Sequence, residues 1–184
     1  MANREDLAFI RGDGSQDTPT GMRYWAPAGN VFAANATINL DNVTADLGEA
    51  VLNLENADVR MIRPTWFINP KTKKYLMTVR DGNGNYAFRD EMLRGTLWGF
   101  PVQSTTQIPR NLGAGTESEV YLADMADAVI GESTEMTIDA SGEAAYFDGS
   151  TVQSSFSRDQ TVIRRIAAHD CVMSYDASIS FMST

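Results

Sequence analysis

The residues best suited to nucleophilic catalysis are His169, Asp170 and Cys171, three consecutive side chains near the C-terminus. An imidazole can activate a thiol, and a carboxylate can orient the imidazole. On a β-strand, however, successive side chains point to opposite faces, so Asp170 faces away from His169 and Cys171. We therefore predict a packed thiol and a surface or interface histidine. With one histidine and one cysteine, the sequence also lacks a zinc ligand set.

A second chemical motif, Asp81-x-Asn83-x-Asn85, is similar to the first half of a calcium-binding loop, in which alternating oxygen atoms surround the ion. Tyr86 and Met92 occupy the positions at which such a loop requires a glycine and a bidentate glutamate. The segment is therefore predicted to be a turn rich in glycine and asparagine.

A group of carboxylates could supply the acid and base of a glycosidase only if two of them faced one cleft, and the sequence does not place them there. They are Glu117, Glu119, Asp124, Asp127, Glu132 and Glu135. The glycines around Asp13 and Ala114 lack the lysine and serine of a phosphate-binding loop and predict turns. We expect the lysines in Lys71–Lys74 to form a solvated helix face. The sequence thus predicts no catalytic residue, no metal and no cofactor.

Composition limits the remaining function classes. The chain has 184 residues, of which 43% are hydrophobic and 21% charged, as expected for one globular domain or two small lobes that share a sheet. Its formal net charge of -9 disfavours a general phosphate-binding surface, so no sequence-specific nucleic-acid binding is expected. An acidic wall can still enclose DNA, because repulsion keeps the polymer from adhering to it.

The location of the protein is predicted from what the sequence lacks. It contains no apolar run of about 18 residues and begins without a secretory signal, so we expect no membrane contact and synthesis in the cytoplasm. The single Cys171 excludes an intrachain disulfide, which fits a reducing compartment.

The N-terminal third is expected to hold little regular structure before its first long helix. Leu7–Ile10 resembles the end of a helix whose earlier turns are missing, and it leads into the turn formers of Gly12–Ser15. The stretch from Gly14 to Asn42 predicts an irregular loop. A helix capped by Thr44 is then predicted to continue through Asn56.

Alternating helix and buried strand follow. An apolar strand is predicted to end at Asn69 because Pro70 stops it, and a helix is predicted from Lys71 to Val79. Leu97–Val102 predicts a strand bent by its glycine and proline. Val120–Ile130 predicts a strand or a passage from strand to helix.

The chain beyond Gly131 predicts a solvated antiparallel sheet, because Thr, Ser and β-branched residues partly alternate there. The expected strands lie within Thr134–Ile138, Val152–Phe156 and Thr161–Met173. Ala177–Met182 predicts a last strand with Ile179 and Phe181 on one face. We expect this strand to return to the central sheet and to bond with Thr65–Asn69 or Leu97–Val102.

The main core is predicted from the apolar faces of these helices and strands. Its expected members are Leu47, Val51, Leu54, Trp66, Ile68, Leu97, Trp98 and Val102.

Several phrases, in this order along the chain, resemble the C-terminal half of tailed-phage major capsid proteins of the Hong Kong 97 type. They are Gly12-Asp13-Gly14-Ser15 followed by Pro19–Met22, then Thr65–Pro70, Leu76–Arg80 before Asp81–Tyr86, Leu97–Val102, Tyr121–Met125, and Asp176–Ile179 near Phe181. Ala123 stands where the family usually has glycine. The resemblance also implies an N-terminal arm, an extended loop and most of a spine helix, which we do not find in this sequence.

This resemblance implies an α+β fold with a central mixed sheet flanked by helices and a peripheral antiparallel β segment. Its expected parts are residues 1–43 (end of the spine helix and loop), 44–131 (axial-type domain), 132–174 (peripheral segment) and 175–184 (returning strand). It implies a structural subunit of an icosahedral shell around DNA, located in the virion and not an enzyme. The implied partners are copies of itself in pentamers and hexamers, with scaffold, protease and portal proteins.

Three alternatives remain at this point. A virion-associated binding module would show an exposed aromatic or polar groove, and an enzyme of an unrecognised type would show a deep pocket that gathers titratable groups. A shell of the same fold could also enclose proteins in place of DNA.

Overall fold

A computed structural model describes residues 2–15 and 17–183. The chain folds into two compact units. The first comprises the residues up to Val129 together with those from Cys171 onward, and the second comprises Ile130–Asp170. Within the described ranges, no helix has the length and apolar character needed to cross a bilayer.

The helices and strands alternate in the first unit, and strands predominate in the second. The helices are α1 (Ala2–Arg11), α2 (Met22–Trp25), α3 (Leu40–Asn56), α4 (Pro70–Thr78) and α5 (Arg89–Arg94), with short 3-10 turns at Ala28–Asn30, Phe156–Arg158 and Asp176–Ser178. The strands are β1 (Val31–Ala33), β2 (Pro64–Ile68), β3 (Thr96–Leu97), β4 (Phe100–Ser104), β5 (Glu119–Asp124), β6 (Ala128–Ser141), β7 (Ala145–Phe147), β8 (Val152–Ser154), β9 (Val162–Met173) and β10 (Ile179–Ser183).

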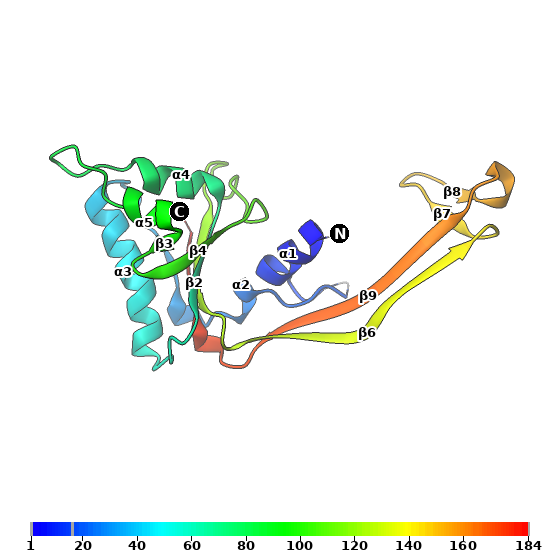
Figure 1. The fold of residues 1–184 in the computed structure, drawn as a ribbon, viewed down its shortest axis with the longest axis horizontal. Coiled ribbons are helices and arrows are strands. Elements are labelled where there is room, and N and C mark those ends of the chain that lie inside the picture. The colour runs from blue at the N-terminus through cyan, green and yellow to red at the C-terminus, as the bar shows by residue number, and fades with distance from the viewer. Residues whose placement is uncertain (1, 16, 184) are drawn as a thin grey trace. The chain divides into compact units, whose positions relative to one another are not determined.

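A six-stranded sheet with the order β1-β10-β5-β2-β4-β3 forms the centre of the first unit (Figure 1). Strand β5 pairs antiparallel with β2 and β10, whereas β2–β4 and β1–β10 are parallel pairs. The sheet is therefore mixed and flanked by helices, which confirms the predicted α+β class.

The junction between β2 and α4 lies where the sequence predicts it. The side chain of Asn69 accepts a hydrogen bond from the backbone N–H of Lys71 (2.9 Å), and Pro70 occupies the first helical position. An N-cap followed by proline suits a helix start, because proline lacks the donor that would have no partner there. The predicted strand end and the following helix are both confirmed.

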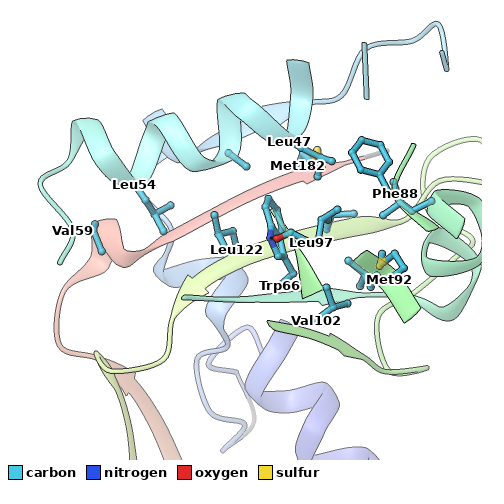
Figure 2. Close-up of a cluster of buried hydrophobic side chains, with 14 residues drawn as sticks. Leu47, Leu54, Val59, Trp66, Phe88, Met92, Leu97, Val102, Leu122 and Met182 are labelled. Carbon is cyan, nitrogen blue, oxygen red and sulfur yellow. Dashed lines mark hydrogen bonds between the residues drawn. The ribbon is translucent and has the colours of Figure 1, made fainter. Parts of the chain in front are cut away.

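The larger core lies between α3 and the sheet, with Trp66 near its centre (Figure 2). The indole N–H of Trp66 donates to the carbonyl oxygen of Leu97 (3.0 Å), so this large side chain is buried without an unsatisfied donor. Six of the eight predicted core residues are buried: Leu47, Leu54, Trp66, Ile68, Leu97 and Val102. Val51 and Trp98 are half-buried at the edge of the cluster.

Helix α3 begins five residues before the predicted start. Its N-cap is Asn39, whose side chain accepts from the backbone N–H of Asn42 (2.8 Å), and the predicted cap Thr44 instead donates to the carbonyl oxygen of Leu40 (2.8 Å). Asparagine and threonine both favour the N-cap position, so residue type alone did not distinguish Asn39 from Thr44, and the predicted cap was wrong. The predicted end at Asn56 is correct.

The predicted bent strand over Leu97–Val102 is two strands, β3 and β4, joined in a tight hairpin. Trp98 and Gly99 form the turn with φ values of 54° and 80°. Two successive positive φ angles match a two-residue hairpin turn of type I′, whose twist suits the flanking strands. The prediction was wrong because tryptophan is an unusual residue at a left-handed position.

The predicted irregular loop over Gly14–Asn42 contains more order than expected. It includes α2, a 3-10 turn and β1, and β1 pairs in parallel with the last strand, β10. Ile10 from α1 and Met22 from α2 are buried in a second apolar cluster on the sheet, together with Tyr121, Ile179 and Phe181. The loop prediction was wrong because β1 has three residues and its partner lies at the opposite end of the chain.

The last strand returns to the central sheet, but not to the neighbours named from the sequence. Strand β10 pairs with β5 on one side and β1 on the other, so β5 separates it from β2. Ile179 and Phe181 share one face as predicted, and Met182 on the other face is buried as well. Both edges of β10 are paired because the strand is internal to the sheet, and the burial of Ile179 to Met182 shows that both of its faces are covered.

Two further segments refine the sequence prediction. The segment Val120–Ile130 holds most of β5 and the start of β6, so it continues as strand and not as helix. Helix α5 was not predicted. Its C-terminus is Gly95 at φ 77°, a left-handed cap that glycine adopts without strain.

The second unit consists of the long strands β6 and β9, which run side by side, and the short antiparallel pair β7–β8 (Figure 1). The three strand segments predicted beyond Gly131 fall within or overlap β6, β8 and β9. This part of the sequence prediction is confirmed.

Candidate assembly interface

The second unit exposes an unusual share of large apolar side chains. Phe156 is 79% exposed and Val152 72% exposed. The other members are Ile130, Ile138, Phe147, Ile163 and Ile166. Single exposed apolar residues are ordinary, but seven within one small hairpin unit indicate a surface that another molecule covers.

Little apolar packing stabilises this unit from within. Among its described side chains, Ser155 alone is buried. The Ser155 hydroxyl donates to the carbonyl oxygens of Gly142 (3.1 Å) and Ala144, and its backbone N–H also donates to Ala144 (3.0 Å). A two-stranded hairpin with so little apolar packing is marginally stable in water. The exposed apolar residues therefore have a structural reason to be covered by a partner.

Three of the four buried carboxylates among the described side chains lie on or next to β5 in the first unit, and each is hydrogen-bonded. Glu119, at the start of β5, forms ion pairs with Arg11 (3.1 Å) and Arg23 and accepts a hydrogen bond from the hydroxyl of Tyr121 (2.5 Å). Burial, followed by the charge of Glu119, raises the pKa of Tyr121 far above its ordinary value of 10.0. This cluster fastens α1 and α2 to the sheet.

Asp124, at the other end of β5, is fully buried and accepts three backbone hydrogen bonds. They come from the N–H groups of Ile62 (2.9 Å), Arg63 (2.8 Å) and Ala126 (3.1 Å). The carboxylate therefore joins the segment that precedes β2 to the turn that follows β5. Its lone pairs accept structural hydrogen bonds from the backbone.

Asp127 is the third buried carboxylate. It accepts hydrogen bonds from the hydroxyl of Ser178 (2.5 Å) and from the guanidinium of Arg60 (2.7 Å). These bonds, that from Ser178 above all, lower the pKa of Asp127 from its ordinary 3.8. Its backbone carbonyl accepts from the N–H of Ser174 (2.8 Å), so Asp127 ties the start of β6 to the segment before β10.

The other carboxylates singled out from the sequence have different surroundings. Glu117 is half-buried in the loop before β5, and Glu132 is exposed beside His169 at 3.7 Å. The side chain of Glu135 lies outside the described residues. Glu119 and Asp124 stand at opposite ends of one strand, each with its own structural partners.

The two motifs considered for nucleophilic and calcium chemistry lie in strand β9 and in the turn at Asp81–Asn85. Cys171 is buried and His169 half-buried. The carboxylate of Asp81 accepts from the backbone N–H groups of Asn83 (2.9 Å) and Asn85 (2.8 Å), closing the predicted turn. Hydrogen bonds from Asn85, the side-chain bond first, lower the pKa of Asp81. Across residues 2–15 and 17–183, no cluster of three or more His, Cys, Asp or Glu residues suits a metal ion.

One cleft of about 530 Å³ opens in the first unit between α3, α4 and the segments around Ala36 and Glu117. Asp46 in its wall accepts two hydrogen bonds from Asn35, and Lys71 donates to the carbonyl oxygen of Thr116 (2.7 Å). These polar groups are bonded to the protein itself.

The exposed apolar residues of the second unit are candidate interface residues that sequence reasoning missed. Val152, Phe156 and Ile163 lie in segments predicted to form a solvated sheet, and Phe147 lies outside the predicted strands. The available signal was that strongly apolar residues recur in strands with no later segment to form a covering layer.

The sequence pattern of the phage capsid family matches residues 1–184. The chain belongs to this family. It is 44% identical over 172 residues to the major capsid protein of Klebsiella oxytoca phage phiKO2, covering 91% of this chain and 40% of that protein. The resemblance inferred from the sequence is therefore confirmed.

Solved structures show the same fold at low sequence identity. The capsid of an empty GTA particle aligns with a TM-score of 0.70 at 19% identity, over 99% of this chain and 61% of that one. A chain of Microbacterium phage Oxtober96 aligns with a TM-score of 0.74 at 15% identity, over 98% and 60%. The chain thus spans well under two thirds of the length of these relatives, and the phage capsid fold prediction is confirmed.

Proposed function

We propose that this chain is the shell-forming part of a phage or prophage major capsid protein, which assembles with copies of itself into an icosahedral shell around DNA. Family membership over the whole chain supports this function. The observation that carries it is the row of exposed apolar residues on the second unit, which another copy would cover.

In this proposal, residues 44–131 and 175–184 form an axial-type domain near the centre of a pentamer or hexamer. Residues 132–174 form the peripheral segment that contacts other copies, and residues 1–43 join these parts to the N-terminal region. In this proposal the chain functions through the surfaces that contact other copies, performs no catalysis, and requires neither metal nor cofactor. The engagement of Glu119, Asp124 and Asp127 in structural bonds supports this view.

The subunit would be made in the cytoplasm of the bacterial host and then reside in the virion. Scaffold, protease and portal proteins are its proposed transient or minor partners. With a net charge of -9, the inner wall would repel DNA and bind no specific sequence.

The test is assembly of the full-length protein carrying Phe156→Asp, measured by sedimentation velocity and electron microscopy. Phe156 is mostly exposed in the single chain, so the variant should fold and melt like the parent protein. A charge at a covered apolar contact should abolish shells. Thr161→Asp is the matched control, because it adds the same charge at an exposed polar position of the same unit and should still assemble. Normal shells from Phe156→Asp would exclude this surface as the interface.

A further inference from the structure

Helix α3 presents an exposed face that is acidic and has an apolar centre. Leu52 is 51% exposed, with Glu49 one turn before it and Glu55 one turn after it on the same face. The helix contains no lysine or arginine. Glu55 lies in its last turn and Asp58 follows, at the end of the helix where the backbone dipole favours cations. A cationic partner would therefore offset the unfavourable interaction of these carboxylates with the negative end of the helix dipole.

The exposed side of helix α5 has an apolar residue with a small positive excess around it. Leu93 is 65% exposed, the exposed Arg89 and Asp90 lie one turn before it, and the exposed Arg94 follows it in sequence. The guanidinium of Arg89 lies 4.5 Å from the ring centre of Tyr86, which holds the charge in place. From Lys71 to Arg94 the chain carries six basic and three acidic residues, a local positive excess in a chain whose net charge is -9.

Both helices pack against the same apolar core, α3 through Leu47, Ala50 and Leu54 and α5 through Met92, but beside different strands of the sheet. Helix α3 contacts β10, the second strand from one edge, whereas α5 contacts β3, the strand at the other edge. Among the residues that the structure describes, Glu49, Glu55, Arg89 and Arg94 form no ion pairs. A head-to-tail contact joins two different faces of a subunit, and it closes into a ring when its rotation allows closure.

We propose that the Leu52 face of α3 in one copy packs against the Leu93 face of α5 in the next copy around a ring. The leucines form the apolar centre, and Glu49 and Glu55 face Arg89 and Arg94 at its rim. An apolar centre with a charged rim is the usual organisation of a specific interface, and opposite charges fix its orientation. This inference rests on the proposed self-assembly and names two of the surfaces that would carry it.

Crosslinking tests the contact directly. Two versions of the full-length protein, one with Leu52→Cys and the other with Leu93→Cys, are co-assembled and oxidised. A disulfide between the two versions can form only between copies, and the native Cys171 is buried. A dimer band should appear in the mixture and not with either version alone. Assembled particles without that band would overturn the proposal.

Charge exchange provides a second test that does not depend on cysteine reactivity. Reversing one face, with Glu49→Lys/Glu55→Lys or with Arg89→Glu/Arg94→Glu, places like charges opposite each other and should reduce particle yield by about tenfold or more. Combining all four substitutions should restore the yield. Lys74→Glu/Arg110→Glu is the control for the second variant, because it makes the same change in net charge at other exposed positions.

The outcomes separate this inference from the proposed function. If the unmodified protein forms no particles under any condition, self-assembly itself is wrong, and the contact proposal falls with it. If the unmodified protein assembles and both single-face reversals assemble equally well, only the α3–α5 contact is wrong. Restoration of assembly in the fourfold variant supports the contact, because a general folding defect would not be repaired by adding further substitutions.

Discussion

Substitution of Asp124 should destabilise the first unit more than any other single change at a carboxylate of β5. Its two oxygens accept the backbone N–H groups of Ile62, Arg63 and Ala126 at 2.8–3.1 Å, and the side chain is completely buried. Removal of the carboxylate leaves these donors without a protein acceptor. Because the segment around Ile62 borders solvent, water can satisfy part of this loss.

The expected magnitude follows from these three bonds. Each hydrogen bond to a charged acceptor contributes about 1.5–3 kcal/mol, and partial access to water reduces the sum. Asp124→Ala should therefore lower the free energy of unfolding by about 3–5 kcal/mol, a large part of the roughly 5–15 kcal/mol typical of a domain. Asp124→Asn keeps one acceptor oxygen but turns an amide donor toward one of the N–H groups, and should cost about 2–3 kcal/mol.

Urea unfolding followed by tryptophan fluorescence and circular dichroism measures these changes under conditions in which the protein is unassembled. Asp139→Ala is the control, because Asp139 forms an exposed ion pair with Arg164 (3.0 Å) and should contribute less than about 1 kcal/mol. If Asp124→Ala lowered the unfolding free energy by no more than the control, the assignment of a structural role to this carboxylate would be refuted.

Three further predictions address the core, the N-terminal segment and pH. Leu54→Ala, at a fully buried position between α3 and the sheet, should cost about 2–5 kcal/mol in a urea titration. Gly12→Ala should destabilise the packing of α1, since the new methyl group would lie 2.0 Å from the carbonyl oxygen of Pro19; faster proteolysis of the N-terminal segment reports this. The folded-state pKa of Asp127 is lowered, chiefly by Ser178, so its contribution is complete above the unfolded value of 3.8 and is lost as the pH falls through the folded value. Unfolding free energy should therefore decline less steeply from about pH 5 to 2 in Asp127→Asn than in the parent protein.

Each of these predictions has a contrary result. Leu54→Ala with a loss no greater than that of Leu52→Ala, at a half-exposed position of the same helix, would place the core elsewhere. Unchanged proteolysis of Gly12→Ala would mean that α1 is not held close to the loop that follows it. Parallel pH profiles for Asp127→Asn and the parent protein would remove Asp127 from the groups that link stability to pH.

Sequence reasoning succeeded where one local signal determines one element. Asn69 and Pro70 together stop a strand and start a helix, and the structure uses both in that way. The buried leucines of α3 and Trp66 were also predicted, because helical spacing and large apolar side chains specify a core face almost independently of the rest of the fold.

Elements that depend on distant partners could not be predicted from local patterns. Strand β1 has three residues and becomes a strand only because β10, from the far end of the chain, lies beside it. Trp98 adopts a left-handed backbone conformation in a hairpin turn. Tryptophan rarely occupies such a position, so the turn could not be recognised from its residues. The pairing of β10 with β5 depends on the whole sheet order, which a local pattern does not contain.

The exposed apolar residues of the second unit also could not be predicted from local patterns. Alternation in β6 and β9 predicted strands correctly, but it could not show which apolar residues would remain uncovered. Phe156 and Val152 are exposed because the second unit has no covering layer of its own, a property of the packed structure and not of any local segment.

Electron microscopy of the full-length protein, expressed together with the products of neighbouring genes, tests the central claim most directly. The proposed function predicts closed icosahedral shells in which this chain is the main component. A protein that is folded and abundant under the same conditions, yet remains monomeric without forming rings or shells, would contradict it.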